Sequence, residues 1–169
     1  STMTGGTILD IRDSTGIAKI DTRGRGVLVL RDLTLSNMGT ADTIPFVKHT
    51  NTVLHVENIA IWGHASKSGL TCDQDGFQHG TARVGYVVDG SATASYSGYG
   101  TTINGVYFNR IRRGIYGLTS CNALQASGLT FGYQCGGDAT AGAIHFDGTG
   151  DQATANQISD VIIEAMDYV

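Results

Sequence analysis

The clearest feature of the sequence is a six-residue pattern of apolar and polar positions that occurs five times. The first, fourth and sixth positions are apolar in every copy, the second is never apolar, and the third is Asp, Asn or Gly. The copies cover residues 30–35, 56–61, 103–108, 126–131 and 158–163. Repeats at spacings of about 20–50 residues are typical of solenoid proteins. The pattern therefore predicts one repeating architecture over residues 1–169, as a single domain.

The third position of the pattern predicts a bend in the main chain. Inward-facing residues recur every two positions along a strand, whereas the first and fourth positions of the pattern are three apart. Both can face one interior only if the backbone turns between them, and Gly, Asn and Asp enter the left-handed conformation with the least strain. We expect each copy to be a strand, a one-residue corner and a second strand, with corners at Asp32, Asn58, Gly105, Gly128 and Asp160.

The spacing of the corners predicts parallel stacking. Successive corners are 26, 47, 23 and 32 residues apart, and we interpret 47 as two turns with a degraded copy near 84–88. A second set of short strands is expected at 44–47, 76–77, 114–116 and 143–146, which gives about three strands per turn. The expected fold is all-β, a right-handed single-stranded parallel β-helix of about seven turns. Its expected inward rows are Leu30/Val56/Ile103/Ala126/Ile158 and Leu35/Ile61/Phe108/Phe131/Ile163.

Composition fits this architecture and excludes some functions. Charged residues make up only 15% of the chain, against roughly 25% in typical globular proteins, and 24 residues are Gly. The net charge of −4 argues against a general nucleic-acid binder, which needs a basic surface. We find no apolar run of the length that spans a membrane, no signal peptide, and an odd number of cysteines that argues against a disulfide framework. Because the sequence starts and stops in strand-like segments, we expect a fragment, a covered end, or an oligomer that buries the ends.

Three segments near the start carry a resemblance to a known family. They are 6–11 (Gly-Thr-Ile-Leu-Asp-Ile), 20–24 (Ile-Asp-Thr-Arg-Gly) and 28–35. Together they resemble the beginning of pectate-lyase-like β-helices, and the nearest group is the tailspikes and receptor-binding proteins of tailed bacteriophages. The resemblance implies a homotrimer, a virion-tail or extracellular location, a long carbohydrate-binding face, and often hydrolase or lyase activity on a bacterial surface polysaccharide. No motif transfers a catalytic residue.

The densest group of reactive side chains is 72–79, Cys-Asp-Gln-Asp-Gly-Phe-Gln-His. If it is a strand, Asp73 and Asp75 project the same way at roughly 7 Å, a separation that suits acid–base cleavage of a glycosidic bond. His79 lies beside them as a candidate ligand-binding residue. The same carboxylates would suit Ca²⁺, and the simpler interpretation is a turn in which Asp side chains bind nearby backbone N–H groups.

A second candidate is the basic run 110–116. Arg110, Arg112 and Arg113 surround one apolar residue, and Tyr116 follows. Guanidinium groups bind acidic sugars in a bidentate way, and in β-helix lyases an Arg or Lys abstracts the proton, so Arg112 or Arg113 could act as that base. The simpler interpretation is a solvated run, or one that pairs with acids on the next turn.

Aromatic residues away from the inward rows form a third set of candidates. Tyr107 occupies an outward position, Trp62 ends a strand, and Tyr96 and Tyr99 lie in a Ser/Ala/Gly-rich loop, 91–100, that we interpret as an insertion. Sugars stack on exposed aromatic faces, although such residues also pack under loops or at subunit contacts. His145, between Ile144 and Phe146, is an outward candidate ligand-binding residue.

Three functions remain open from the sequence. The first is glycan recognition by a tailspike-like β-helix with depolymerase activity, using Asp73 and Asp75 as acid and base and Glu164 or Asp147 as further candidates. The second is a secreted polysaccharide lyase or epimerase, which would use Ca²⁺. The third is a fibre or adhesin module without catalysis. The first and third need no cofactor, and we identify no metal-ligand spacing among the histidines.

Overall fold

The computed structural model describes residues 7–10, 20–37, 45–63, 76–79, 84–88, 91–95, 101–111, 113–117, 124–135, 143–146, 156–164 and 166–167. Every regular element in these ranges is a β-strand, and they contain no helix. The all-β expectation is therefore confirmed for the part of the chain that the structure describes.

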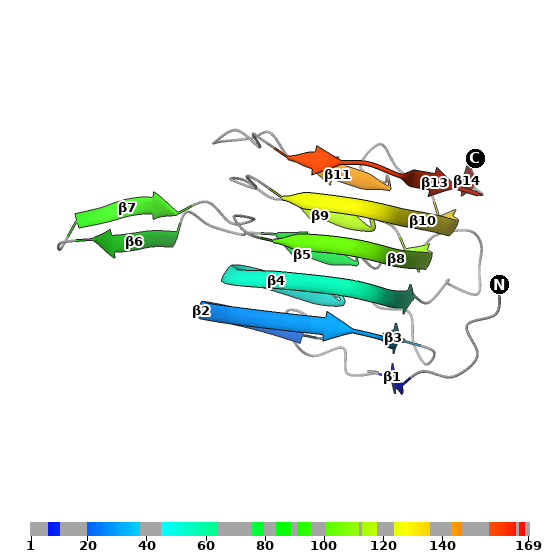
Figure 1. Ribbon diagram of the computed structural model, residues 1–169, viewed down its shortest axis with the longest axis horizontal. Coiled ribbons are helices and arrows are strands. Elements are labelled where there is room, and N and C mark those ends of the chain that lie inside the picture. The colour runs from blue at the N-terminus through cyan, green and yellow to red at the C-terminus, as the bar shows by residue number, and fades with distance from the viewer. Residues whose placement is uncertain are drawn as a thin grey trace.

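The strands form one 12-stranded sheet and a separate two-stranded sheet. Strands β2, β4, β8 and β10 lie side by side as the longest members of the large sheet (Figure 1). The strands are β1 (Thr7–Asp10), β2 (Ile20–Arg31), β3 (Leu33–Ser36), β4 (Val47–Trp62), β5 (Phe77–His79), β6 (Val84–Val88), β7 (Ser91–Ser95), β8 (Thr102–Ile111), β9 (Ile115–Gly117), β10 (Gln125–Cys135), β11 (Ile144–Phe146), β12 (Gln157–Ile158), β13 (Val161–Ile163) and β14 (Met166–Asp167).

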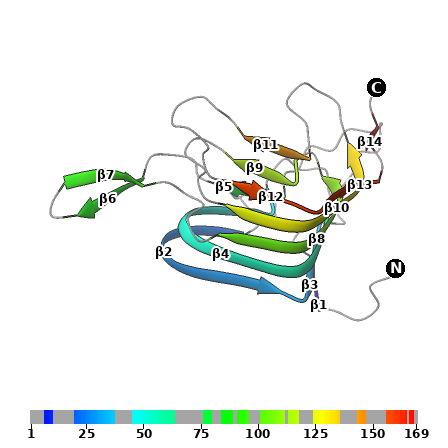
Figure 2. The same ribbon diagram turned by 45° about the horizontal axis from the view of Figure 1, so that its top comes forward.

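The large sheet is built in parallel layers. The start of β4 lies between β2 and β5, its middle between β2 and β8, and its end between β3 and β8. The neighbours of this one long strand therefore change twice along its length. The strands bend together as nested curves (Figure 2). Residues Ile20, Val47, Phe77, Ile115 and Ile144 are in register across the layers. The short strands expected at 76–77, 114–116 and 143–146 are confirmed as β5, β9 and β11, whereas Val47, at the end of the segment expected at 44–47, is the first residue of the long strand β4.

The five corner residues lie in neighbouring positions along one edge, and all five have a positive φ. We call them the corner row. The pairings on either side of each bend place Asn58 beside Gly105 and Gly105 beside Gly128. The φ angles are 53° at Asp32, 54° at Asn58, 63° at Gly105, 61° at Gly128 and 52° at Asp160. The expectation that Asp, Asn and Gly turn the chain through the left-handed conformation is confirmed.

Polar contacts between layers follow the outer side of this edge. The Asn58 side-chain amide donates to Asp32 Oδ1 at 2.7 Å, and the Ser127 hydroxyl donates to Asn104 Oδ1 at 2.8 Å. Arg31 and Glu57 form an ion pair at 2.6 Å, but their side chains are 60% and 58% exposed, so the pair contributes little stability. The edge is therefore shaped mainly by backbone conformation, with polar side chains completing its surface.

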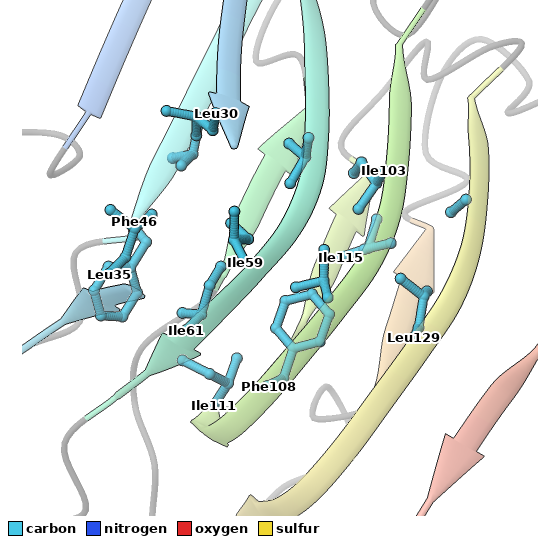
Figure 3. Packing of buried hydrophobic residues seen from close by; sticks show 14 of the residues in the cluster. Leu30, Leu35, Phe46, Ile59, Ile61, Ile103, Phe108, Ile111, Ile115 and Leu129 are labelled. Atoms are coloured by element: carbon cyan, nitrogen blue, oxygen red, sulfur yellow. The ribbon is translucent and has the colours of Figure 1, made fainter. Parts of the chain in front are cut away.

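The interior consists of the two predicted apolar rows and their neighbours. Each residue of these rows is in register with the next, from Leu30 to Ile158 and from Leu35 to Ile163. Side chains from opposite sides of the layers meet in one cluster (Figure 3). Only the last layer departs from full burial: Ile158 is half-buried and Ile163 is 48% exposed.

Large and small residues alternate across this interior. Phe108 and Phe131 are fully buried and stack on each other, with ring centroids 4.8 Å apart and an interplanar angle of 6°. Opposite them lie glycines: a Cβ on Gly76 would lie 2.9 Å from Phe108 Cε1, and a Cβ on Gly114 would collide with Phe131 Cε1. The two phenylalanines thus fill space that the two glycines leave open.

The structure corrects the interpretation of 84–88 as a degraded repeat. β6 (Val84–Val88) pairs antiparallel with β7 (Ser91–Ser95) in a hairpin, and β4 pairs directly with β8, so no layer lies between them. The hairpin projects away from the large sheet (Figure 1). In the part of the chain that the structure describes, the 47-residue interval therefore adds no layer between β4 and β8, and the expected count of about seven turns wrongly included one at 84–88. The described strands supply the five corner layers, with β1 beside the first.

Candidate functional site

Trp62, the last residue of β4, is the most exposed aromatic side chain among those whose burial the structure describes on the large sheet. Ile61 is fully buried, and the next residue, Trp62, is 46% exposed because alternate strand residues face opposite sides. Trp62 is in register with Ser36 on one side and Asn109 on the other. Its ring therefore lies on the outer face of the sheet, with a polar side chain on the next strand.

The backbones of 62–63 and 109–110 are in close contact. The Gly63 N–H donates to the Asn109 carbonyl at 2.9 Å. A Cβ on Gly63 would collide with the carbonyl oxygen of Arg110 and lie 2.8 Å from Ile111 Cδ1. Glycine at position 63 thus allows the strand that carries Trp62 to lie directly against the segment that carries Arg110.

Arg110 is exposed and has a φ of 54°. Its left-handed conformation bends β8 a second time, so that Asn109 stays on the outer face while Ile111 enters the core with no exposed surface. In a straight strand these two residues would face the same side. The bend leaves Arg110 on the outside of the sheet beside the Trp62 segment.

Tyr107 and Asn109 form a polar pair beside Trp62. The Asn109 side-chain amide donates to the Tyr107 hydroxyl at 3.1 Å, which leaves the Asn109 carbonyl oxygen as an acceptor and the tyrosine proton as a donor. Tyr107 is half-buried, and a Cβ on Gly132 would lie 2.6 Å from its Cζ. The ring thus packs along the sheet over Gly132. We call Trp62, Tyr107, Asn109 and Arg110 the outer-face site.

Arg113 and Glu164, two other predicted site residues, differ in how much of each is exposed to solvent. Arg113 is only 8% exposed, and its carbonyl accepts from the Gly76 N–H at 2.8 Å. Glu164 is exposed and follows Ile163, the partner of Phe131, so it lies on the outer face two layers from Asn109, about 10 Å at the usual strand spacing. The structure thus places Glu164 near the outer-face site and buries Arg113.

Among the remaining candidates, Tyr116 and His145 share a second line of backbone positions, and His79 lies one position further along β5. Tyr116 on β9 is in register with Gln78 on β5 and with His145 on β11. His79 is in register with His49 on β4. The register brings these candidates together on the short strands, apart from the outer-face site, which is built on β4 and β8.

Several predicted candidates lie outside the described residues. They are Asp73, Asp75, Arg112, Asp147, Tyr96 and Tyr99. The proposed acid–base pair is therefore not part of the geometry given above.

Sequence reasoning selected Trp62, Tyr107 and Arg110 separately and missed Asn109 and the two glycines that bring them together. The offset between the repeats containing 56–61 and 103–108 already aligns Trp62 with Asn109. Trp62 is the residue directly after the repeat 56–61, and adding the same offset of 47 gives Asn109. The sequence alone would thus have identified this pair.

Comparison of this chain with models of protein families, with curated proteins and with solved structures finds no match. In the described ranges, no group of three or more His, Cys, Asp and Glu residues is arranged to hold a metal ion. Those ranges also contain no helix with the length and apolar character needed to cross a membrane.

Proposed function

We propose that this chain is a right-handed single-stranded parallel β-helix that recognises a bacterial surface glycan in the manner of a phage tailspike, on a virion tail. The proposal is supported by stacked parallel layers, a left-handed corner in five of them, and a large aromatic ring on the outer face. Solenoids present long surfaces that suit extended polymers.

The observation that carries the proposal is the setting of Trp62. A large aromatic ring that is 46% exposed next to a polar pair offers both things that sugar binding needs. The indole face accepts ring C–H groups, while Asn109 and Tyr107 supply an acceptor and a donor for hydroxyl groups. Trp62 is therefore the residue on which sugar affinity should depend most.

Replacing Trp62 by Ala is expected to weaken glycan binding by about tenfold or more, because it removes the stacking surface. Trp62→Phe should retain part of the affinity. Gln125→Ala is the control, since Gln125 is exposed at the start of β10 and belongs neither to the outer-face site nor to the proposed subunit contact. Binding to an array of bacterial capsular and O-antigen polysaccharides measures the effect. Equal binding by wild type and Trp62→Ala would contradict the role of the outer-face site.

Catalysis is a separate part of the proposal, and it rests on Asp73 and Asp75 as acid and base. Incubation with the bound polysaccharide should release reducing ends without absorbance from unsaturated uronides, and Asp73→Ala and Asp75→Ala should each abolish the release. A rise in that absorbance would instead support the lyase alternative. Binding without any cleavage would leave a receptor-binding module.

Assembly into a homotrimer completes the proposed function. Val27 and Val29 are 63% and 57% exposed on neighbouring outward positions of β2, and apolar side chains of this kind suit a lateral contact between subunits. Light scattering coupled to size-exclusion chromatography is expected to give three times the chain mass of 17.7 kDa. A monomer at micromolar concentration would contradict the tailspike-like assembly.

A further inference from the structure

The six described residues with a positive φ are not equivalent in residue type. Gly105 and Gly128 have no Cβ, while Asp32, Asn58 and Asp160 have short polar side chains that tolerate the left-handed conformation. Arg110 alone among these six carries a long side chain at a φ of 54°. Any residue with a Cβ is strained there, and Arg has no short polar group that offsets the strain locally.

The fold needs a bend in the main chain at position 110, but the bend itself does not need an arginine. The bend moves Ile111 into the core, and a glycine would make the same bend with less strain. Residues in strained conformations cluster at functional sites, where the side chain serves a purpose other than folding. The strain at Arg110 thus points to a role for its guanidinium group.

Arg110 is exposed, and the carboxylate that the structure places nearest to its site, Glu164, lies two layers from Asn109. Within the described residues Arg110 takes part in no ion pair, whereas Arg31 is paired with Glu57. The Arg110 backbone lies against Gly63, one residue after Trp62. Its side chain therefore begins about one strand spacing from the segment that carries the indole ring.

We infer that the outer-face site selects a glycan that carries a carboxylate, with the acidic sugar bound by Arg110 beside the indole ring of Trp62. A guanidinium group binds a carboxylate through two parallel hydrogen bonds, which fixes both charge and orientation. This inference rests on the proposed function and adds to it the class of sugar and the residue that selects it.

Substitutions of Arg110 distinguish an effect on glycan binding from an effect on the stability of the protein. Arg110→Gly is expected to weaken binding of acidic glycans by about tenfold or more, while the thermal midpoint stays unchanged or rises by up to about 4 °C because the left-handed strain is removed. Arg110→Lys keeps the positive charge but lacks the planar guanidinium group that makes two parallel hydrogen bonds, and it should bind with intermediate affinity. Arg31→Gln, at an arginine on the corner edge, should bind as wild type.

The probes are bacterial capsular polysaccharides offered in native form and after reduction of their carboxyl groups to alcohols. Wild type is expected to bind native acidic capsules and to lose about tenfold in affinity when the carboxyl groups are reduced. Equal binding of both forms, or full binding by Arg110→Gly, would overturn the selection of a carboxylate while leaving glycan recognition in place. A markedly lower midpoint for Arg110→Gly would show that the side chain is structural. Binding of no polysaccharide in either form would refute the proposed function itself.

Discussion

Replacing Phe131 by alanine is expected to lower the free energy of unfolding by about 3–5 kcal/mol, the usual cost of removing a buried phenylalanine ring. Phe131 has no exposed surface, and its ring stacks on that of Phe108 at 4.8 Å. The truncation would remove this contact and open a cavity over Gly114, since no side chain at 114 can fill the space. Urea unfolding followed by circular dichroism would measure the change.

Two comparisons make this expectation specific to the packing of Phe131 against Gly114. Gln125→Ala truncates an exposed side chain on the same strand as Phe131, and we expect a change within about 0.5 kcal/mol. Gly114→Ala should destabilise wild type because its Cβ collides with Phe131 Cε1, but it should cost less in a Phe131→Leu background, which lacks that atom. Strictly additive effects of the changes at 114 and 131, or a loss for Phe131→Ala no larger than for Gln125→Ala, would contradict this arrangement.

The sequence was sufficient to predict the corners because the bend depends on single residues. Whether position 32, 58 or 105 turns the chain is decided by the backbone preference of Asp, Asn or Gly, and that preference is local. The inward rows followed from the same reasoning, since the apolar positions flank each corner. The register between layers needed only the assumption that equivalent positions stack.

The interval between Asn58 and Gly105 could not be interpreted by its length alone. A span of 47 residues fits two turns, and it also fits one turn with an excursion. A local signal did favour the excursion: Asp89-Gly90 separates two strand-like segments, a dipeptide typical of two-residue hairpin loops. The structure pairs Val88 with Ser91 across that dipeptide.

The outer-face site was only partly predictable for a related reason. Exposure of Trp62 follows from the alternation of strand residues, but its contact partners depend on which layer comes next. An extra turn at 84–88 would have separated Trp62 from Asn109 and Arg110. The direct pairing of β4 with β8 brings them together, and the glycine at position 63 permits the close approach.

Replacing Gly105 by valine is expected to lower the free energy of unfolding by about 2 kcal/mol or more. At a φ of 63° a residue other than Gly, Asn or Asp is strained by roughly 1–2 kcal/mol, and a β-branched side chain is strained further. The added Cβ would lie 3.5 Å from the Asn58 backbone nitrogen on the neighbouring layer, an ordinary van der Waals contact, so the expected loss comes from the backbone conformation and not from a clash.

The corner row itself supplies the matched control for this change. Asn58 already occupies the adjacent corner at a φ of 54°, so Gly105→Asn should cost less than about 1 kcal/mol. Asp160→Gly, at an exposed corner, should change stability by no more than about 0.5 kcal/mol. Urea midpoints for the three variants rank them directly. If valine were tolerated at position 105 as well as asparagine, the main chain would not pass through the left-handed conformation there. The stacked corners that place Trp62 and Arg110 on one face would then lose their physical basis.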